Sequence, residues 1–446
     1  MFQLQNYRIL PETLFPRDHE RHWIIMNWFI PFNKLTPEQQ KLVGLSTESN
    51  RVMFGGPGSG KTIILLHRAY YLHKAKHIPI DKIHIFVYNN TLLSFIQSGL
   101  IALGLDPAMA STLDSWCYHY YQAHIGKKIP RILASSNPDF HEIRMQTYQK
   151  ICLMDSSPQY QAVMVDEGQD LDEICYKIFL KISRHVTVAC DYNQQIYEIT
   201  ETQDSLIRLL NAQNNHSTLN RLVRCTRGVA NIAEAFISNI NQKQEFRNQV
   251  DLIERRDQIP AFQIAPYNSR ESSELMKQIR MRVNDGDSVG IVFPTNRTLF
   301  GFVKAAVKEG IEIETPTKTK FSKAHDFNNL TPKAFTIFGI KGLTFDVVLI
   351  PFLQHRFYAQ MNADRLLKSL FVAVTRAVHW VYFSSTKEIF PNRDVFNDLK
   401  HTKLLEYHVI PSDQTDIFEM LGNNETQGTD FLNDEEDSSD DFSDLL

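Results

Sequence analysis

The sequence predicts an α/β fold made of two successive parallel-sheet units. Short apolar runs rich in β-branched and aromatic residues alternate with longer helix-like segments, as in the run at 51–56 followed by the helical pattern at 61–75. The runs are apolar along their whole length, which is typical of a parallel sheet covered by helices on both faces. With 446 residues, 43% hydrophobic and 22% charged, the chain resembles a soluble globular protein with room for two or three domains.

The same rhythm occurs twice along the chain. In the first unit, strands are expected at 51–56, 82–90, 161–167 and 186–191, and helices at 61–75, 91–100 and 172–182. In the second, strands are expected at 261–267, 288–296, 334–340, 346–353 and 379–385, and a helix at 302–310. The absence of a short internal repeat argues against a solenoid. The predicted domains are an N-terminal extension at 1–34, a first α/β domain at 35–218 with a short insertion near 118–160, a second at 219–412, and a tail at 413–446.

Charge is distributed unevenly. The segment 413–446 contains 12 Asp and Glu residues and no Lys or Arg, so the other 39 acidic residues face 47 basic ones and the body has a net charge of +8. A basic body suits a polyanionic partner, although ordinary surface charge is an equal explanation. The tail is poor in apolar residues and is expected to be disordered. It could mimic a nucleic-acid strand, dock to a partner protein, or only aid solubility.

Cysteine usage and hydropathy point to a cytoplasmic protein. The five cysteines are dispersed and never spaced as CxxC, so neither a zinc site nor a disulfide framework is indicated. The apolar stretch HWIIMNWFIPF at 22–32 is too short to span a bilayer and contains a proline. No membrane or export signal is expected.

The stretch GGPGSGKT matches the phosphate-loop pattern G-x-x-x-x-G-K-[ST], with a strand before it and a helix after it. Its glycines allow backbone N–H groups and the positive end of the helix to face a phosphate. Lys61 is expected to bridge the β- and γ-phosphates of ATP, and Thr62 to offer its hydroxyl to Mg²⁺. The predicted nucleotide-binding residues here are Gly55, Gly56, Pro57, Gly58, Ser59, Gly60, Lys61 and Thr62. The alternative is a glycine-rich turn that matches by chance.

Carboxylates follow a second buried strand in VMVDEGQD, about 100 residues after the phosphate loop. The carboxyl ends of parallel strands form the usual ligand crevice of such folds. Asp166 is therefore expected to hold Mg²⁺, and Glu167 to orient or deprotonate the attacking water. The alternative is an acidic helix N-terminus that only caps the helix at 172–182.

The segment DEGQD also resembles the DExQD box of UvrD/Rep-like superfamily 1 helicases, and further boxes of that family follow in order. They are LTPEQQKLV at 35–43, VYNNTLLSF at 87–95, STLDSW at 111–116, ACDYNQQIYE at 189–198, LNRLVRCT at 219–226, IKGLTFD at 340–346 and LFVAVTRA at 370–377. The resemblance covers roughly residues 35 to 385. It implies two tandem RecA-like domains of the P-loop NTPase class.

The resemblance also implies roles for residues outside the phosphate loop. Gln39 corresponds to the glutamine that reads adenine, and Tyr197 to the tyrosine that stacks on it. Gln194 corresponds to the γ-phosphate sensor. Arg224 and Arg376 correspond to arginines of the second domain that reach across a cleft to neutralise charge on the γ-phosphoryl group. As isolated residues, both arginines would more often be ordinary surface groups.

Several positions depart from the family pattern. Phe338 and Gly339 replace a histidine and a serine, and Thr344 replaces a glutamate. The tryptophan that stacks on a base is missing after Tyr197; Tyr192 could substitute or could simply pack. Lys318, Lys320 and Lys323 form a basic loop that either contacts phosphates or is solvated.

The spacing between boxes leaves no room for the large insertion domains of full-size relatives. Cys117 and Val163 are 46 positions apart, and Glu314 and Phe335 are 21 apart. The sequence thus predicts a reduced ATP- and Mg²⁺-dependent helicase or translocase on single-stranded nucleic acid, with DNA favoured and 3′-to-5′ polarity implied by the resemblance. The main alternative is a nucleotide-gated regulatory subunit of a partner nuclease or polymerase. A phosphate-loop NTPase unrelated to nucleic acid is a third.

Overall fold

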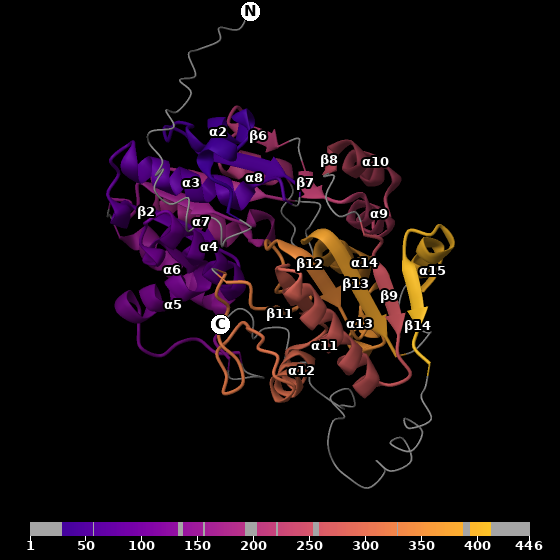
Figure 1. Ribbon diagram of the computed structural model, residues 1–446. Helices are drawn as coiled ribbons and strands as arrows, with labels where there is room; N and C mark the ends of the chain where they lie inside the picture. The colour runs from indigo at the N-terminus through magenta and orange to yellow at the C-terminus, as the bar shows by residue number, and fades with distance from the viewer. Residues whose placement is uncertain are drawn as a thin grey trace, which may run out of the picture. The chain divides into compact units, whose positions relative to one another are not determined.

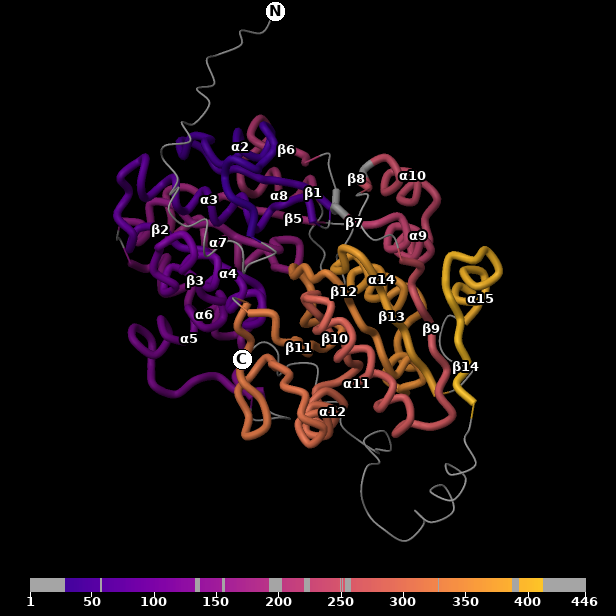
Figure 2. Tube along the Cα trace, viewed as in Figure 1, coloured from indigo at the N-terminus to yellow at the C-terminus, as the bar shows by residue number. Residues whose placement is uncertain are grey.

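The chain forms two compact units, with the boundary between Leu222 and Val223. The computed structural model describes residues 29–56, 58–132, 137–154, 157–191, 203–219, 222–252, 258–327, 329–386 and 393–411. Each unit contains a six-stranded parallel sheet flanked by helices (Figure 1), and the predicted tandem RecA-like α/β fold is confirmed. Figure 2 follows the path from the indigo first unit to the yellow end of the second.

The first unit has the strand order β3-β2-β4-β5-β1-β6, and every pair is parallel. The strands are β1 Arg51–Gly55, β2 Ile83–Val87, β3 Ala110–Thr112, β4 Ala162–Val165, β5 Val186–Cys190 and β6 His216–Leu219. The α-helices are α2 Pro37–Val43, α3 Lys61–Lys74, α4 Asn90–Ala102, α5 Leu113–His124, α6 Phe140–Leu153, α7 Glu173–Ile182 and α8 Gln203–Leu209. Short 3-10 turns are η2 Phe32–Lys34, η3 Ile80–Lys82, η4 Pro107–Met109 and η5 Gly168–Asp170.

Helices cover both faces of this sheet because alternate strand residues point to opposite sides. In β5, Val186 and Val188 belong to a buried apolar cluster with side chains of α5, α6, α7 and α8. Thr187 between them accepts a hydrogen bond from the buried Arg68 of α3, so it faces the other layer. Burial on both faces explains why these strands are apolar throughout.

The second unit has the strand order β11-β10-β12-β13-β9-β14, again parallel. The strands are β9 Ala261–Ile264, β10 Val289–Phe293, β11 Lys333–Thr336, β12 Phe345–Ile350, β13 Ala377–Ser385 and β14 Glu406–Val409, with a separate pair β7 Leu222–Cys225 and β8 Val250–Leu252. The helices are α9 Arg227–Ala235, α10 Ile240–Gln249, α11 Asn268–Asn284, α12 Asn296–Lys308, α13 Arg356–Gln360, α14 Ala363–Val374 and α15 Arg393–His401.

The core of the second unit also has two layers. Side chains of α11 and α12 cluster with one face of the sheet, including Ile291 and Val347. On the other face, Phe383 of β13 packs against Phe236 beside α9 and Phe396 of α15, with ring centroids 6.2 and 5.1 Å away. The strand predicted at 346–353 is shorter than expected: β12 begins at Phe345 and ends at Ile350.

Parallel topology brings several predicted segments to one edge of the first sheet. The phosphate loop follows β1, the carboxylates follow β4, and the segments at 87–95 and 111–116 follow or include the ends of β2 and β3. The carboxyl ends of all six strands meet at this edge. The fold therefore gathers residues that lie more than 100 positions apart in sequence.

Candidate functional site

The phosphate loop connects β1 to α3 and requires glycine at several points. Gly58 and Gly60 have φ values of 67° and 85°, in the left-handed region that favours glycine. A Cβ atom on Gly60 would lie 2.5 Å from Nε2 of Gln39, and one on Gly55 would lie 2.5 Å from Oγ of Ser59. Backbone conformation or close approach therefore excludes a side chain at each of these glycine positions.

Ser59 places a buried hydroxyl in this loop. The residue is 3% exposed, and its Oγ has no hydrogen-bond partner within the described part of the chain. A buried polar atom without a partner costs about 1–3 kcal/mol unless a ligand or water satisfies it. The N-terminus of the 14-residue helix α3 lies beside it, where N–H groups and the helix dipole favour an anion. The loop therefore fits the phosphates of a nucleotide.

Lys61 is buried at the start of α3. Its Nζ donates to the carbonyl oxygens of Gly55 at 2.7 Å and Gly56 at 2.9 Å. The same Nζ lies 3.8 Å from Oδ2 of Asp191, directly after β5. The ammonium group is thus held at the loop by two neutral carbonyl oxygens and one more distant carboxylate. A bound phosphate could replace these partners.

Thr62 and Asp166 bring two oxygen donors together from β1–α3 and β4. The Thr62 hydroxyl donates to Oδ2 of Asp166 at 2.6 Å. Burial, and then repulsion by Glu167, raise the pKa of Asp166 to about 6. Mg²⁺ prefers oxygen ligands and in nucleotide sites uses one or two carboxylates plus substrate phosphates. The pair therefore fits Mg²⁺, although no group of three or more His, Cys, Asp or Glu side chains forms a metal site among the described residues.

Glu167 occupies a strained position after β4. Its φ of 53° lies in the left-handed region, which costs a non-glycine residue about 1–3 kcal/mol. Its Oε2 accepts a hydrogen bond of 2.6 Å from Nε2 of Gln169, whose Oε1 accepts one of 2.8 Å from the N–H of Asp191. Gln169 therefore ties the Glu167 carboxylate to the end of β5.

Sequence reasoning did not assign roles to three residues that shape this site: Gly168, Gln169 and Asp191. A Cβ atom on Gly168 would lie 2.4 Å from Cγ1 of Val188 and 2.8 Å from the hydroxyl of Tyr176. Gln169 stands inside the DEGQD box, and Asp191 directly follows an apolar strand. These sequence positions could have drawn attention to Gln169 and Asp191. Their hydrogen bond, however, depends on how β4 and β5 pair, which the sequence does not show.

Gln39 is tied to both α2 and the phosphate loop. It forms a capping box with Thr36, whose N–H donates to Oε1 of Gln39 at 2.9 Å. Its Nε2 donates to the carbonyl oxygen of Ser59 at 2.9 Å. The side-chain amide of Gln39 has a second N–H and a second lone pair on its oxygen. Recognition of a base by Gln39 must use these two remaining positions, or break its hydrogen bonds to Thr36 and Ser59.

Four predicted site groups cannot be located in this way. Pro57, Gln194, Tyr197 and the side chain of Arg224 lie outside the described residues. Tyr192, the possible substitute for the missing tryptophan, lies outside them too.

Arg376 is the penultimate residue of the segment 370–377 in the second unit and is buried. Its Nε donates to the carbonyl oxygen of Val372 at 3.0 Å, and one terminal nitrogen donates to the hydroxyl of Thr375 at 3.2 Å. Thr226 lies two residues after Arg224. Its N–H donates to the carbonyl oxygen of Val378 at 2.9 Å, and its hydroxyl donates to the carbonyl oxygen of His379 at 2.8 Å. The two arginine-bearing segments are thus joined within one unit.

The positions that depart from the family pattern have structural surroundings of their own. Phe338 packs beside the ring of Phe357 at 6.1 Å, and the guanidinium of Arg365 lies 5.0 Å from its ring centroid. Thr344 is exposed. In the basic loop, Lys323 pairs with Glu312 at 2.7 Å.

Aromatic side chains line α5 next to the segment 111–116. Trp116 and Tyr120 are stacked, with ring centroids 5.2 Å apart, and both are partly exposed. The indole N–H of Trp116 donates to the hydroxyl of Tyr160 at 3.1 Å. Partly exposed stacked rings can support a nucleobase or simply pack on the protein surface.

Three comparisons relate this chain to known proteins, and one of them, with a family model, falls in the first unit. The family model described as "AAA domain" matches residues 39–200. The mitochondrial ATP-dependent DNA helicase HMI1 of Saccharomyces cerevisiae is 36% identical over 73 residues, which cover 16% of this chain and 10% of that helicase. The match thus spans a tenth of the relative's length. The C-terminal domain of a possible DNA helicase from Lactobacillus plantarum WCFS1 aligns with 41% of this chain and 97% of that domain, at 16% identity and a TM-score of 0.31.

The fold, the phosphate loop and the AAA-domain match over residues 39–200 together define a P-loop nucleotide-binding domain in the first unit. Within the described residues, no helix is long and apolar enough to cross a membrane.

Proposed function

We propose that the chain is an ATPase of the UvrD/Rep-like superfamily 1 type that moves along single-stranded nucleic acid. The observation that supports this most directly is the grouping of Lys61, the Thr62–Asp166 pair and Glu167 at one edge of the first sheet. Cations, oxygen ligands and a buried carboxylate are the groups that hydrolysis of ATP to ADP and phosphate requires.

Each residue has a proposed task. The loop from Gly55 to Thr62 binds the phosphates, and Lys61 neutralises part of their charge. Thr62 and Asp166 would hold Mg²⁺, which would supply positive charge to neutralise the phosphate oxygens and so ease attack by water. Glu167 orients that water and accepts its proton.

The remaining roles rest on the family resemblance. Gln39 and Tyr197 are proposed to contact adenine, Gln194 to sense the γ-phosphate, and Arg224 and Arg376 to stabilise the charge that develops on it.

Nucleic acid is the proposed partner, with single-stranded DNA favoured and 3′-to-5′ movement. The support is the ordered set of boxes and the resemblance to a protein named as a DNA helicase. The five free cysteines fit a reducing compartment such as the cytoplasm.

A regulatory subunit is the second candidate, and the short chain between α5 and β4 favours it. Only α6 forms a helix in the described part of this insertion, so the duplex-gripping domain of larger helicases is not accommodated there. Such a subunit would control a nuclease or polymerase through its nucleotide state.

Steady-state ATP turnover with and without single-stranded DNA or RNA tests the proposal. A motor should hydrolyse ATP faster by tenfold or more with one of them. An ATP turnover rate that neither single-stranded DNA nor RNA changes would support an NTPase unrelated to nucleic acid. Tight ATP binding with negligible turnover under all conditions would support the regulatory subunit.

A further inference from the structure

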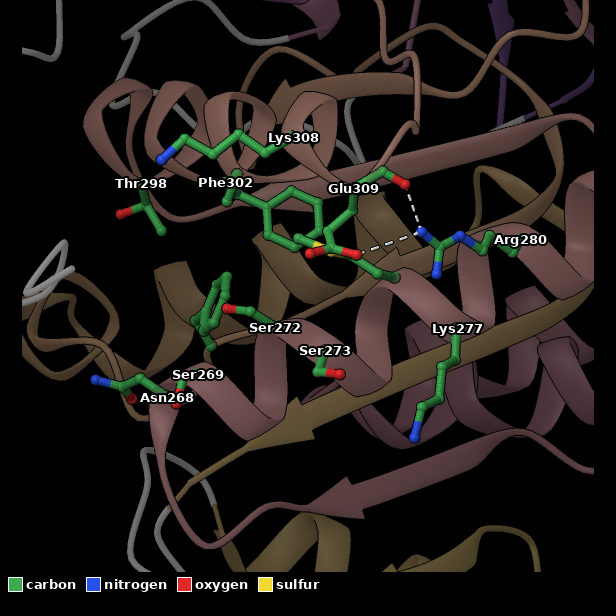
Figure 3. A pocket seen from close by; sticks show the side chains of 13 residues that line it. Asn268, Ser269, Ser272, Ser273, Lys277, Arg280, Thr298, Phe302, Lys308 and Glu309 are labelled. Atoms are coloured by element: carbon green, nitrogen blue, oxygen red, sulfur yellow. Dashed lines mark hydrogen bonds and ion pairs between the residues drawn. The ribbon is translucent and has the colours of Figure 1, made fainter. Parts of the chain in front are cut away.

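A cavity in the second unit lies between α11 and α12 and has a volume of about 390 Å³. Figure 3 shows the ring of Phe302 between the two helices, with serines of α11 on one side and Lys308 of α12 on the other. Its apolar lining comes from Met276, Phe302, Ala305 and Phe352. None of the residues that line this cavity is among those assigned to the proposed nucleotide site.

The cavity presents hydroxyl and ammonium groups that a ligand could bond in place of solvent. The hydroxyls of Ser269, Ser272 and Ser273 line it, and none of them hydrogen-bonds to a described residue. Lys308 likewise has no ion-pair partner among the described residues. The single acidic side chain in the lining, Glu309, is 3.7 Å from the guanidinium of Arg280.

The charge of the lining favours an acidic occupant. Lys277, Arg280 and Lys308 face one carboxylate, Glu309, so the lining has a net charge of +2. Lys277 also pairs with Glu274, at 2.7 Å, but its side chain is 55% exposed, and such surface pairs exchange readily. A suitable ligand therefore combines carboxylates with an apolar group of side-chain size.

The chain itself contains such a ligand. The segment DDFSDLL at 440–446 has three carboxylates and three apolar side chains in seven residues, within a tail that has no Lys or Arg. Pro411 and Asp440 are separated by roughly 30 residues, and a random-coil chain of that length has an r.m.s. span of about 30 Å. A unit of roughly 190 residues has a radius of gyration of about 16 Å, so a chain of that length can reach any face of it.

We propose that residues 440–446 bind in the α11–α12 cavity, with Phe442 over the apolar lining and the carboxylates beside Lys277, Arg280 and Lys308. Tethering supplies a local concentration in the millimolar range, so a weak fit suffices for occupancy. A nucleic-acid strand would need an extended groove that follows its backbone, whereas this cavity has the volume of a few side chains. The proposal does not depend on the nucleotide-site assignment.

Disulfide trapping in the full chain tests this placement. In a Cys152→Ser background, Ser443→Cys is combined either with Ser273→Cys in the cavity or with Gln242→Cys on the exposed surface of α10. Both pairs share the tail cysteine and differ only in the second position. Under mild oxidation at low salt, the Ser273→Cys pair should cross-link at least tenfold faster than the Gln242→Cys pair.

Charge reversal supplies the second readout. The double variant Lys277→Glu, Lys308→Glu should remove most of the faster cross-linking of the Ser273→Cys pair, because it turns attraction of the acidic tail into repulsion. Salt raised to about 0.5 M should have the same effect in the unreversed chain, because salt screens electrostatic attraction. Equal rates for the two cysteine pairs would overturn the proposal. It would also be overturned if charge reversal left the cross-link intact but weakened binding of a single-stranded oligonucleotide, since the surface would then serve nucleic acid.

Discussion

Asp166 and Glu167 are adjacent in sequence, but their side chains have different partners. Asp166 faces the Thr62 hydroxyl, whereas Glu167 accepts a hydrogen bond from Gln169. The contact with the Thr62 hydroxyl suits Asp166 as a metal ligand. The hydrogen bond from Gln169 holds the Glu167 carboxylate in a separate position, where it could accept a proton. The two residues should therefore differ when each is neutralised.

Lys61→Ala should abolish ATP binding, because it removes the phosphate charge and its geometry together. Glu167→Gln should keep ATP bound but slow turnover by about a hundredfold or more, the range for loss of a general base. Binding of a fluorescent ATP analogue and phosphate release measure the two effects separately. Glu173→Gln, at an exposed position on α7, is the matched control. Near-normal turnover by Glu167→Gln would show that another group orients the water.

Arg376→Ala should slow turnover by about a thousandfold if the residue acts as an arginine finger does. Its guanidinium also bonds to Val372 and Thr375 within the second unit, so thermal unfolding must be measured alongside. Loss of nucleotide affinity with turnover intact would count against the role. A turnover defect that merely follows the loss of folded protein would assign Arg376 a structural function.

At the scale of elements, the turn η5 after β4 has no space for a side chain at Gly168. Gly168→Ala would bring Cβ within 2.4 Å of Cγ1 of Val188, and forced packing of this kind costs about 1–3 kcal/mol. The shift should also displace Glu167 and lower turnover. Gly126→Ala is the control, since nothing lies within 4 Å of its added Cβ. Urea denaturation and ATPase assays should separate the two variants, and equal stabilities would show that the turn relaxes freely.

Helix α11 is joined to the end of the second sheet through the buried carboxyl of Glu271. It accepts hydrogen bonds from the N–H of Phe352, the hydroxyl of Ser384 and Nε2 of Gln354. Burial nevertheless raises its pKa from 4.5 to about 7. The folded unit holds this proton where the unfolded chain has lost it, so stability falls as pH rises from about 4.5 to about 7.

Glu271→Gln should remove this part of the pH dependence, which is of order 1–3 kcal/mol. Urea midpoints at several pH values between 4.5 and 7 measure the slope. Glu274→Gln, on a more exposed turn of the same helix, should keep the wild-type slope. An unchanged slope in Glu271→Gln would mean that the buried carboxyl does not titrate in this range.

The central strands could be predicted from sequence, and so could the buried edge strand β11, while the edge strands β6 and β14 could not. β4 and β5 are fully buried and therefore apolar throughout. β6 and β14 lie at sheet edges and are largely exposed, so they lack that pattern. At the site, Lys61 and Asp166 stand out by motif, but the Gln169 bridge depends on the separation of two strand ends that are distant in sequence.

At the scale of the whole molecule, the insertion between α5 and β4 limits what the proposed motor can do. Helix α6 packs on α5 and α7, and its Arg144 bonds to Asp114 at 2.5 Å. This ion pair anchors the short insertion to the body of the first unit. The described insertion is therefore part of that unit's surface rather than a separate arm.

Unwinding a duplex requires a wedge or a second duplex contact in addition to a moving strand grip, and the short insertion offers little chain for either. Each base-pair step costs about 1.4 kcal/mol of stacking, and one ATP supplies several times that, so the wedge is limiting rather than the energy. We therefore predict ATP hydrolysis and movement on single strands, but weak unwinding by the isolated chain. The measurement is displacement of a 3′-tailed duplex of roughly 20 base pairs.

Removal of streptavidin from a biotinylated single strand, with the same preparation, is the control that shows the motor moving. Movement without displacement, restored by a partner protein, is the expected pattern. Rapid and processive displacement by the chain alone would mean that its short connections, or the aromatic segment at 22–32, already separate the strands. A motor that depends on a partner for its wedge would then be the wrong description, and the search for strand-separating residues would move to the chain itself.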